Sequence, residues 1–73
     1  MESKQDLALF RKFSEIFYSA KSFVESKHID TAREQYLELL SLYEQIQDTT
    51  YREIAFEQLL RLRSSIDEWI IDI

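Results

Sequence analysis

The chain contains neither glycine nor proline in its 73 residues. These two residue types mark most tight turns and strand ends, because glycine adopts positive φ angles and proline fixes φ. Their absence also removes every glycine-rich loop that could hold a phosphate group. A chain without them is best explained by helices that are joined by short polar turns.

Apolar residues recur at steps of three and four in three segments, which is the spacing of one face of an α-helix. The spacing predicts helices over residues 3–26, 31–47 and 51–72. The predicted core faces are Leu9, Phe13, Ile16, Phe17, Ala20, Phe23 and Val24 with Phe10 at the edge, then Ala32, Tyr36, Leu39, Leu40, Tyr43 and Ile46, then Tyr51, Ala55, Leu59, Leu62, Ile66, Trp69, Ile70 and Ile73. Three such helices with short loops pack around one core. The sequence therefore predicts a single all-α domain, residues 1–73, as an antiparallel three-helix bundle.

Polar residues between the apolar segments indicate where each helix begins. The predicted caps are Glu2 or Ser3 for the first helix, Asp30 or Thr31 with Glu34 for the second, and Thr50 with Glu53 for the third. Asp6 lies in the first turn, where the helix dipole favours a negative charge. No glycine follows the first helix, so we expect it to end without the usual Schellman residue before a turn at residues 27–30.

The net charge of −5 is unevenly distributed along the chain. Residues 1–29 carry five basic and four acidic side chains, whereas residues 30–73 carry four basic and ten acidic ones. An acidic half argues against nucleic acid, which binds proteins mainly through Lys and Arg contacts to phosphates. It favours a basic protein or peptide as the partner.

Cysteine is absent, so disulfides and thiolate metal sites are excluded. This is consistent with a reducing compartment. No apolar run reaches the length of a membrane span, and the N-terminal residues lack the pattern of a signal peptide. We expect a cytoplasmic location.

No motif in the sequence predicts catalysis or cofactor binding. Glu25 and His28 form a Glu-x-x-His pair, but di-iron helical bundles use two such pairs and this chain has one histidine. The serines have no histidine partner other than His28, and no Gly-x-Ser-x-Gly turn exists. We expect no enzymatic activity, no metal and no cofactor.

The first two predicted helices resemble a tetratricopeptide repeat over residues 13–46. Ala20 and Ala32 match the two small positions of that helical hairpin, which allow the helices to approach closely. Large apolar residues at the neighbouring positions are Ile16, Phe23, Tyr36 and Leu39, and the departures from the repeat are Ser19, Lys27 and Glu44. The resemblance implies a hairpin that the long third helix covers like a lid. Tetratricopeptide repeats usually stack in arrays of three or more, and this chain has one such hairpin.

The combination of a hairpin and a third long helix is also similar to the microtubule-interacting and trafficking domain. That family is a three-helix module that binds amphipathic peptides from filament-forming partners. The similarity implies a peptide-binding function, but no peptide-contacting residue of that family is matched at a particular position here.

Several apolar residues fall outside the predicted core faces. Phe56 and Leu60 lie one turn apart on a flank of the third helix, and Ile71 lies further along the same flank. Leu37 and Tyr18 lie off the stripes of the second and first helices. Either the third helix buries both of its flanks, or this flank is an interaction surface.

The outer face of the second helix is acidic, with Glu34, Glu38 and Glu44. Such a face is usually only solvated, but Glu34 and Glu38 are also candidate contacts for a basic peptide. The predicted function is a small adaptor that binds a partner helix or peptide. The alternatives are a structural protein that forms a homodimer with coiled-coil-like packing, and an acidic inhibitor or nucleic-acid mimic.

Overall fold

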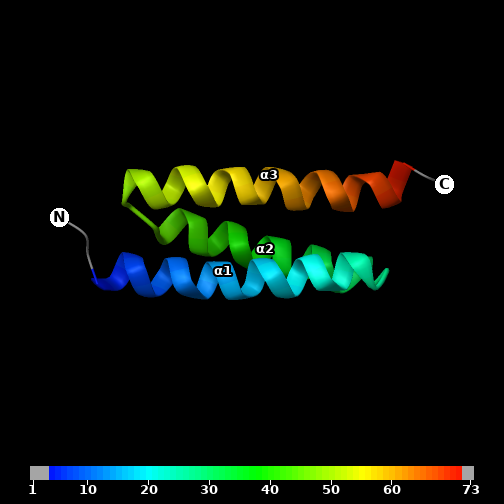
Figure 1. Cartoon of the computed structure of the whole chain (residues 1–73), viewed down its shortest axis with the longest axis horizontal. Coiled ribbons are helices and arrows are strands. Elements are labelled where there is room, and N and C mark those ends of the chain that lie inside the picture. The colour runs from blue at the N-terminus through cyan, green and yellow to red at the C-terminus, as the bar shows by residue number, and fades with distance from the viewer. Residues whose placement is uncertain (1–3, 72–73) are drawn as a thin grey trace.

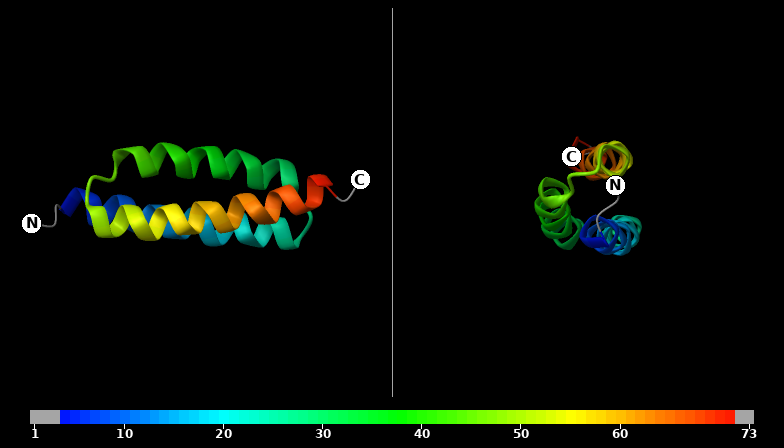
Figure 2. Two further views of the ribbon diagram at one scale, coloured as in Figure 1. Left: turned by 90° about the horizontal axis from the view of Figure 1, so that it is seen from above. Right: turned by 90° about the vertical axis from the view of Figure 1, so that its left-hand side faces the viewer.

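Three helices form the described part of the chain: α1 (Lys4–Glu25), α2 (Ile29–Gln45) and α3 (Thr49–Ile71). The computed structural model describes the backbone of residues 4–71 and the side chains of residues 4–68. The predicted all-α three-helix fold is confirmed. Figure 1 shows that α2 runs opposite to α1 and α3, in a rod of 47 × 16 × 15 Å. Seen end-on in Figure 2, the helices occupy the corners of a triangle.

The hydrophobic core fills the space between the three helices. Ala20 of α1 and Ala32 of α2 are both fully buried. The buried apolar residues are Phe13, Phe17, Ala20, Val24, Ala32, Leu39, Leu42, Ile46, Ala55, Leu59, Leu62 and Ile66. Burial of these side chains supplies the main favourable free energy of folding, at about 25 cal/mol per Å² of apolar surface.

The buried face of α2 differs from the prediction at Leu42. Leu42 is only 6% exposed, whereas Leu40 is half-buried at the edge of the core. Gln35 donates a hydrogen bond to Ser19 of α1 at 3.2 Å, and Leu42 lies two turns beyond Gln35 on the same side of α2. Leu42 is therefore buried on the α1 side of the helix, and Leu40 faces the α3 side.

α1 ends in a motif that usually contains glycine. Lys27 adopts φ 66° in the left-handed region. The N–H of His28 donates to Phe23 O at 2.8 Å and the N–H of Lys27 donates to Val24 O at 3.0 Å. This is a complete Schellman motif with lysine in place of glycine. α1 therefore ends without glycine, the usual Schellman residue, as predicted, and still forms the hydrogen bonds of the motif.

The Schellman motif also fixes the start of α2. The carbonyl of His28 already accepts from Ala32 N at 3.1 Å, so α2 begins at Ile29. His28 occupies the N-cap position without a side-chain cap hydrogen bond. The predicted caps Asp30 and Thr31 are therefore wrong, because both residues lie inside the first turn of α2.

The start of α3 is capped by Asp48 and not by Thr50. Asp48 Oδ1 accepts from Tyr51 N at 3.1 Å, and Asp48 O accepts from Arg52 N at 2.9 Å. α3 therefore begins at Thr49, two residues before the predicted start. The predicted Thr50–Glu53 capping box is wrong because both residues are already helical.

The connection between α2 and α3 is held by Asp6 of α1. Its carboxylate accepts from the backbone N–H groups of Gln47 at 3.4 Å and Asp48 at 3.0 Å. Asp6 is only 7% exposed, so it is part of the interior of this end of the bundle. Its position in the first turn was predicted, but its burial and its two partners were not.

Some predictions fall on parts of the chain that the structure does not describe. The proposed caps Glu2 and Ser3 lie outside the described residues, as do the side chains of Trp69, Ile70, Ile71 and Ile73. In residues 4–71, none of the helices combines the length and apolar character that crossing a membrane requires.

Candidate functional site

Five large apolar side chains are exposed in the described part of the chain. The exposed fractions are 64% for Tyr18, 64% for Leu37, 41% for Ile54, 51% for Phe56 and 51% for Leu60. Exposed apolar residues are common on proteins when they are scattered, and only a contiguous patch indicates an interaction site. Their relative positions therefore decide their significance.

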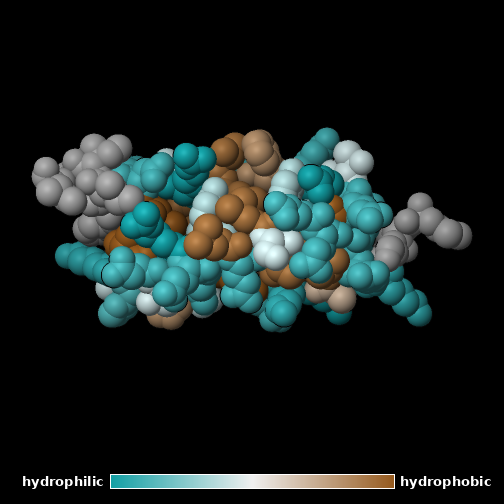
Figure 3. All heavy atoms as spheres, turned by 180° about the vertical axis from the view of Figure 1, so that it is seen from behind, coloured by the Kyte–Doolittle hydropathy of each residue, from teal (hydrophilic) through white to brown (hydrophobic). Residues whose placement is uncertain are grey.

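Leu37 and Phe56 line the groove between α2 and α3, and Leu60 lies one turn after Phe56 on α3. The rings of Tyr43 and Phe56 lie 6.3 Å apart and mark a point where the two helices meet. Because these helices run in opposite directions, Leu37 lies further along the groove in the direction in which Leu60 follows Phe56. Figure 3 is seen from the side of α2 and shows apolar side chains near the middle of this face, over α2 and α3.

Two hollows lie along the α2–α3 groove. One has a volume of about 380 Å³ and is lined by Arg33, Tyr36, Leu37, Leu40, Arg63, Ile66 and Asp67. The other has a volume of about 340 Å³ and is lined by Tyr43, Thr49, Arg52, Glu53 and Phe56. Half-buried side chains from the edge of the core, Tyr36, Leu40 and Tyr43, form the apolar floor. The groove is thus apolar at its centre and charged at both ends.

The end of the groove at Arg33 carries net positive charge. Arg63 Nε lies 3.8 Å from Asp67 Oδ2, four positions further along α3. Both of these side chains are more than half exposed, so the pair adds only about 0.3–0.5 kcal/mol to stability. Arg33 has no ion-pair partner among the described side chains, and its charge is not compensated.

At the other end of the groove, Arg52 and Glu53 carry opposite charges, and the arginine is turned toward the end of α2. The guanidinium of Arg52 donates to Ile46 O at 2.7 Å and to Tyr43 O at 3.2 Å, and it lies 4.3 Å from the centre of the Tyr43 ring. Arg52 therefore satisfies the last carbonyls of α2 and offsets the negative end of that helix. Glu53 is exposed and has no ion-pair partner among the described side chains.

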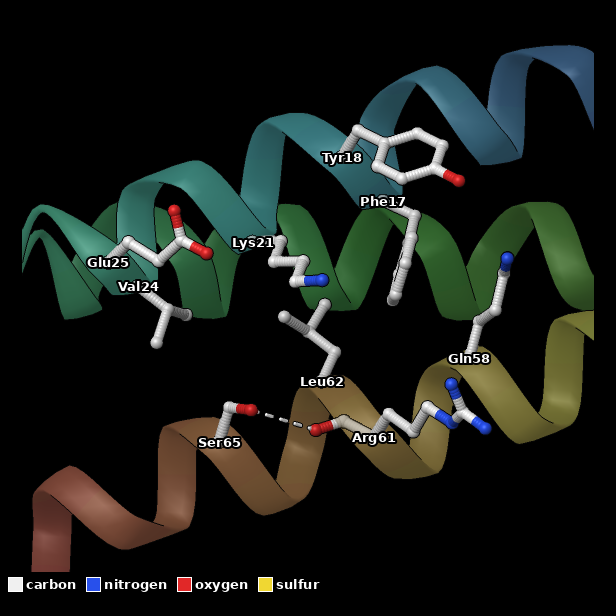
Figure 4. Close-up of a pocket in the computed structure, with 9 residues that line it drawn as sticks. All are labelled: Phe17, Tyr18, Lys21, Val24, Glu25, Gln58, Arg61, Leu62 and Ser65. Carbon is white, nitrogen blue, oxygen red and sulfur yellow. Dashed lines mark hydrogen bonds between the residues drawn. The ribbon is translucent and has the colours of Figure 1, made fainter.

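A separate pocket of about 260 Å³ lies between α1 and α3. Figure 4 shows Phe17, Val24 and Leu62 at its floor and the Lys21 side chain reaching from α1 toward α3. Tyr18 lines this pocket and not the α2–α3 groove. The side-chain oxygen Oε1 of Gln58 is buried without a hydrogen-bond partner. Arg61 at the rim is paired with Glu57 at 2.9 Å.

The structure thus divides the predicted contact residues into groups. Leu37 and Phe56 line the α2–α3 groove, Leu60 lies one turn after Phe56 without lining either hollow, and Tyr18 lines the α1–α3 pocket. Glu34 and Glu38 are exposed on α2 but line neither hollow of the groove. The side chain of Ile71 lies outside the described residues.

Sequence reasoning missed other residues of the groove. Tyr36, Leu40 and Tyr43 were placed in the core, because their spacing shows that they face inward but not how much of each remains exposed at the edge. The sequence pattern also gave no indication that three charged residues line the groove, namely Arg33, Arg52 and Glu53. The 9- and 6-residue separations of Arg52 from its two carbonyl partners carry no periodic signal.

In the described part of the chain, no three His, Cys, Asp or Glu side chains are grouped so that they could hold a metal ion. Comparisons with protein-family models, with curated proteins and with solved structures gave no match. The resemblances to the tetratricopeptide repeat and to the microtubule-interacting and trafficking domain therefore stay predictions from the residues alone. The α2–α3 groove is the candidate site that the geometry supports.

Proposed function

We propose that this chain is a small, non-enzymatic protein-interaction module, an adaptor whose α2–α3 groove binds an amphipathic helix of another protein. The observation that carries the proposal is that the exposed side chains Leu37 and Phe56 line two hollows between the same pair of helices, with exposed Leu60 one turn after Phe56 on α3. Removal of these side chains from water would provide the binding free energy, at about 25 cal/mol per Å² before the losses of association.

A helix suits the shape of this groove. Two neighbouring helices present parallel ridges of side chains, and a third helix packs its own ridge between them. The groove extends at least from Arg33 to Tyr43, which is about 15 Å along α2 at 1.5 Å per residue. A partner helix of about three turns would cover it.

The charge distribution favours a partner with basic residues over a second copy of the chain. Residues 30–73 contain ten acidic and four basic side chains. The net negative charge of this segment opposes the approach of a second copy through α2 and α3. We place the module in the cytoplasm, and the absence of cysteine supports that proposal.

The experiment uses a designed peptide of about 18 residues, long enough to form a helix on binding. The peptide carries a leucine stripe at helical spacing and lysines elsewhere. Its affinity for the full chain is measured by calorimetry, and light scattering records the mass of the chain alone. We expect the variant Leu37→Ser, Phe56→Ser to bind at least about tenfold more weakly, since removal of central apolar anchors has effects of this size.

Two controls separate this binding from nonspecific attraction. The variant Tyr18→Ser removes an equally exposed apolar side chain outside the groove and should bind the peptide normally. A scrambled peptide of the same composition has no apolar stripe and should bind weakly. The proposal would be refuted if both peptides bound with equal affinity. It would also be refuted if the Tyr18→Ser variant lost as much affinity for the peptide as the groove variant. A dimer that the groove variant dissociates would instead favour the structural homodimer.

A further inference from the structure

The two ends of the α2–α3 groove differ in charge, and this difference bears on how a partner helix lies in it. Arg33 is uncompensated at one end, where the charges of Arg63 and Asp67 offset each other. Glu53 is the exposed charge at the other end and has no ion-pair partner among the described side chains, since the Arg52 guanidinium beside it is turned onto the carbonyls at the end of α2. The centre of the groove, at Leu37, Leu40 and Phe56, is apolar.

We propose that this charge polarity selects the direction of the bound helix, so that the partner runs parallel to α2 with an acidic residue beside Arg33 and a basic residue beside Glu53. This inference rests on the proposed function of the groove. It adds the arrangement of charges that the partner must carry and the orientation in which it binds.

The required spacing follows from the length of the groove. Arg33 and Tyr43 line the two hollows and are separated by about 15 Å along α2. The acidic and basic residues of the partner are therefore about ten or eleven positions apart, or three helical turns. The intervening turns carry the apolar stripe that covers Leu37, Phe56 and Leu60.

The direction of the partner follows from its own dipole. A helix is stabilised by an acidic residue near its N-terminus and a basic residue near its C-terminus. A partner helix with this favourable arrangement places its N-terminal acidic residue at Arg33 and its C-terminal basic residue at Glu53. Because α2 runs from Arg33 toward Tyr43, the partner runs parallel to α2 and antiparallel to α3 (Figures 1 and 2).

Charge pairs at the rim of an interface act mainly on orientation and partner choice, since exposed pairs contribute little affinity. In the opposite orientation, the acidic residue of the partner would lie beside Glu53 and its basic residue beside Arg33, so that like charges would meet at both ends. We therefore expect the preferred direction to be strong at low salt and to weaken as added salt screens the rim charges.

The test uses two peptides of identical composition with the same leucine stripe. One has glutamate near its N-terminus and lysine about eleven positions later, and the other has these two residues exchanged. Each carries a nitroxide label at its N-terminus, and broadening of the amide resonances of the full chain locates the label. We expect the first peptide to broaden residues near Arg33 and the exchanged peptide to broaden residues near Glu53.

A charge-reversed protein provides the matched comparison. In the variant Arg33→Glu, Glu53→Arg, the label of the first peptide should move to the opposite end of the groove. The control variant Arg11→Glu, Glu15→Arg exchanges two exposed charges of α1 and should leave the label where it was. Both variants keep the apolar side chains Leu37, Phe56 and Leu60, so the peptide should still bind.

The outcomes separate the two proposals. Broadening at both ends of the groove by either peptide would show binding without orientation, which overturns the present inference and leaves the proposed function standing. The same label position for both peptides would also overturn it. Failure of both peptides to broaden any groove residue would refute the proposed function, and the inference with it.

Discussion

The carboxylate of Asp6 accepts a hydrogen bond from the backbone N–H of Asp48 at 3.0 Å, across 42 positions of sequence. Asp48 in turn accepts from Tyr51 N through its side chain and so caps α3. The first turn of α1 is thereby connected to the first turn of α3. One buried carboxylate thus holds the connection between α2 and α3, and α3 carries Phe56 of the groove.

Replacement of Asp6 by alanine is expected to lower the free energy of unfolding by about 1–3 kcal/mol, since it leaves two backbone N–H groups without their charged acceptor. Urea denaturation measures the change. Asp6→Asn is the control, because its single side-chain oxygen can replace only one of the two acceptor oxygens. The free energy of unfolding of Asp6→Asn should lie between the values of the alanine variant and the natural chain. An alanine variant within about 0.5 kcal/mol of the natural chain would contradict this role.

Replacement of Lys27 by glycine is expected to stabilise the chain. Lys27 has φ 66°, and the left-handed conformation disfavours residues with a Cβ atom by about 1–2 kcal/mol. Glycine loses more backbone entropy on folding, by roughly 0.5–1 kcal/mol, so the net gain is about 0.5–1 kcal/mol. Lys27→Ala is the matched comparison because it removes the lysine side chain and keeps the Cβ atom. The glycine variant should unfold at a higher temperature than the alanine variant, and the reverse order would rule out this explanation.

Leu39 and Leu37 form a matched pair two positions apart on α2. Leu39 is completely buried and Leu37 is 64% exposed. Leu39→Ala should lower the free energy of unfolding by about 2–5 kcal/mol through lost burial and the cavity that remains. Leu37→Ala should change it by no more than about 0.5 kcal/mol. Urea midpoints test both values, and similar losses at the two positions would mean that the faces of α2 are wrongly assigned.

The periodic pattern of apolar residues was sufficient to predict the helices and most of the core. Phe13, Leu39 and Leu62 lie on stripes of three- and four-residue spacing, and all three are buried. The same pattern placed Phe56, Leu60 and Leu37 outside the stripes, and they are exposed. A residue's position around its own helix depends only on local geometry, which a single sequence contains.

Helix ends were predicted less well because their partners are not local. The carboxylate of Asp6 and the backbone N–H of Asp48 meet only after three helices have packed, so no local pattern could reveal the bond. Leu42 was missed because the width of the buried face of α2 depends on where α1 lies. Lys27 was missed because the Schellman turn usually requires glycine.

The sequence by itself determined three amphipathic helices, the residues of their inner stripes and the apolar side chains left outside them, since all of these follow from helical periodicity. Only the tertiary structure decided that Leu37 and Phe56 belong to one groove while Tyr18 lies in another. It also decided that the Arg52 guanidinium is turned onto the end of α2, and that Arg33 and Glu53, at opposite ends of that groove, have no ion-pair partner among the described side chains. The physical reason is that grooves and charge pairs between helices depend on the packing register, which hydrophobic periodicity does not specify.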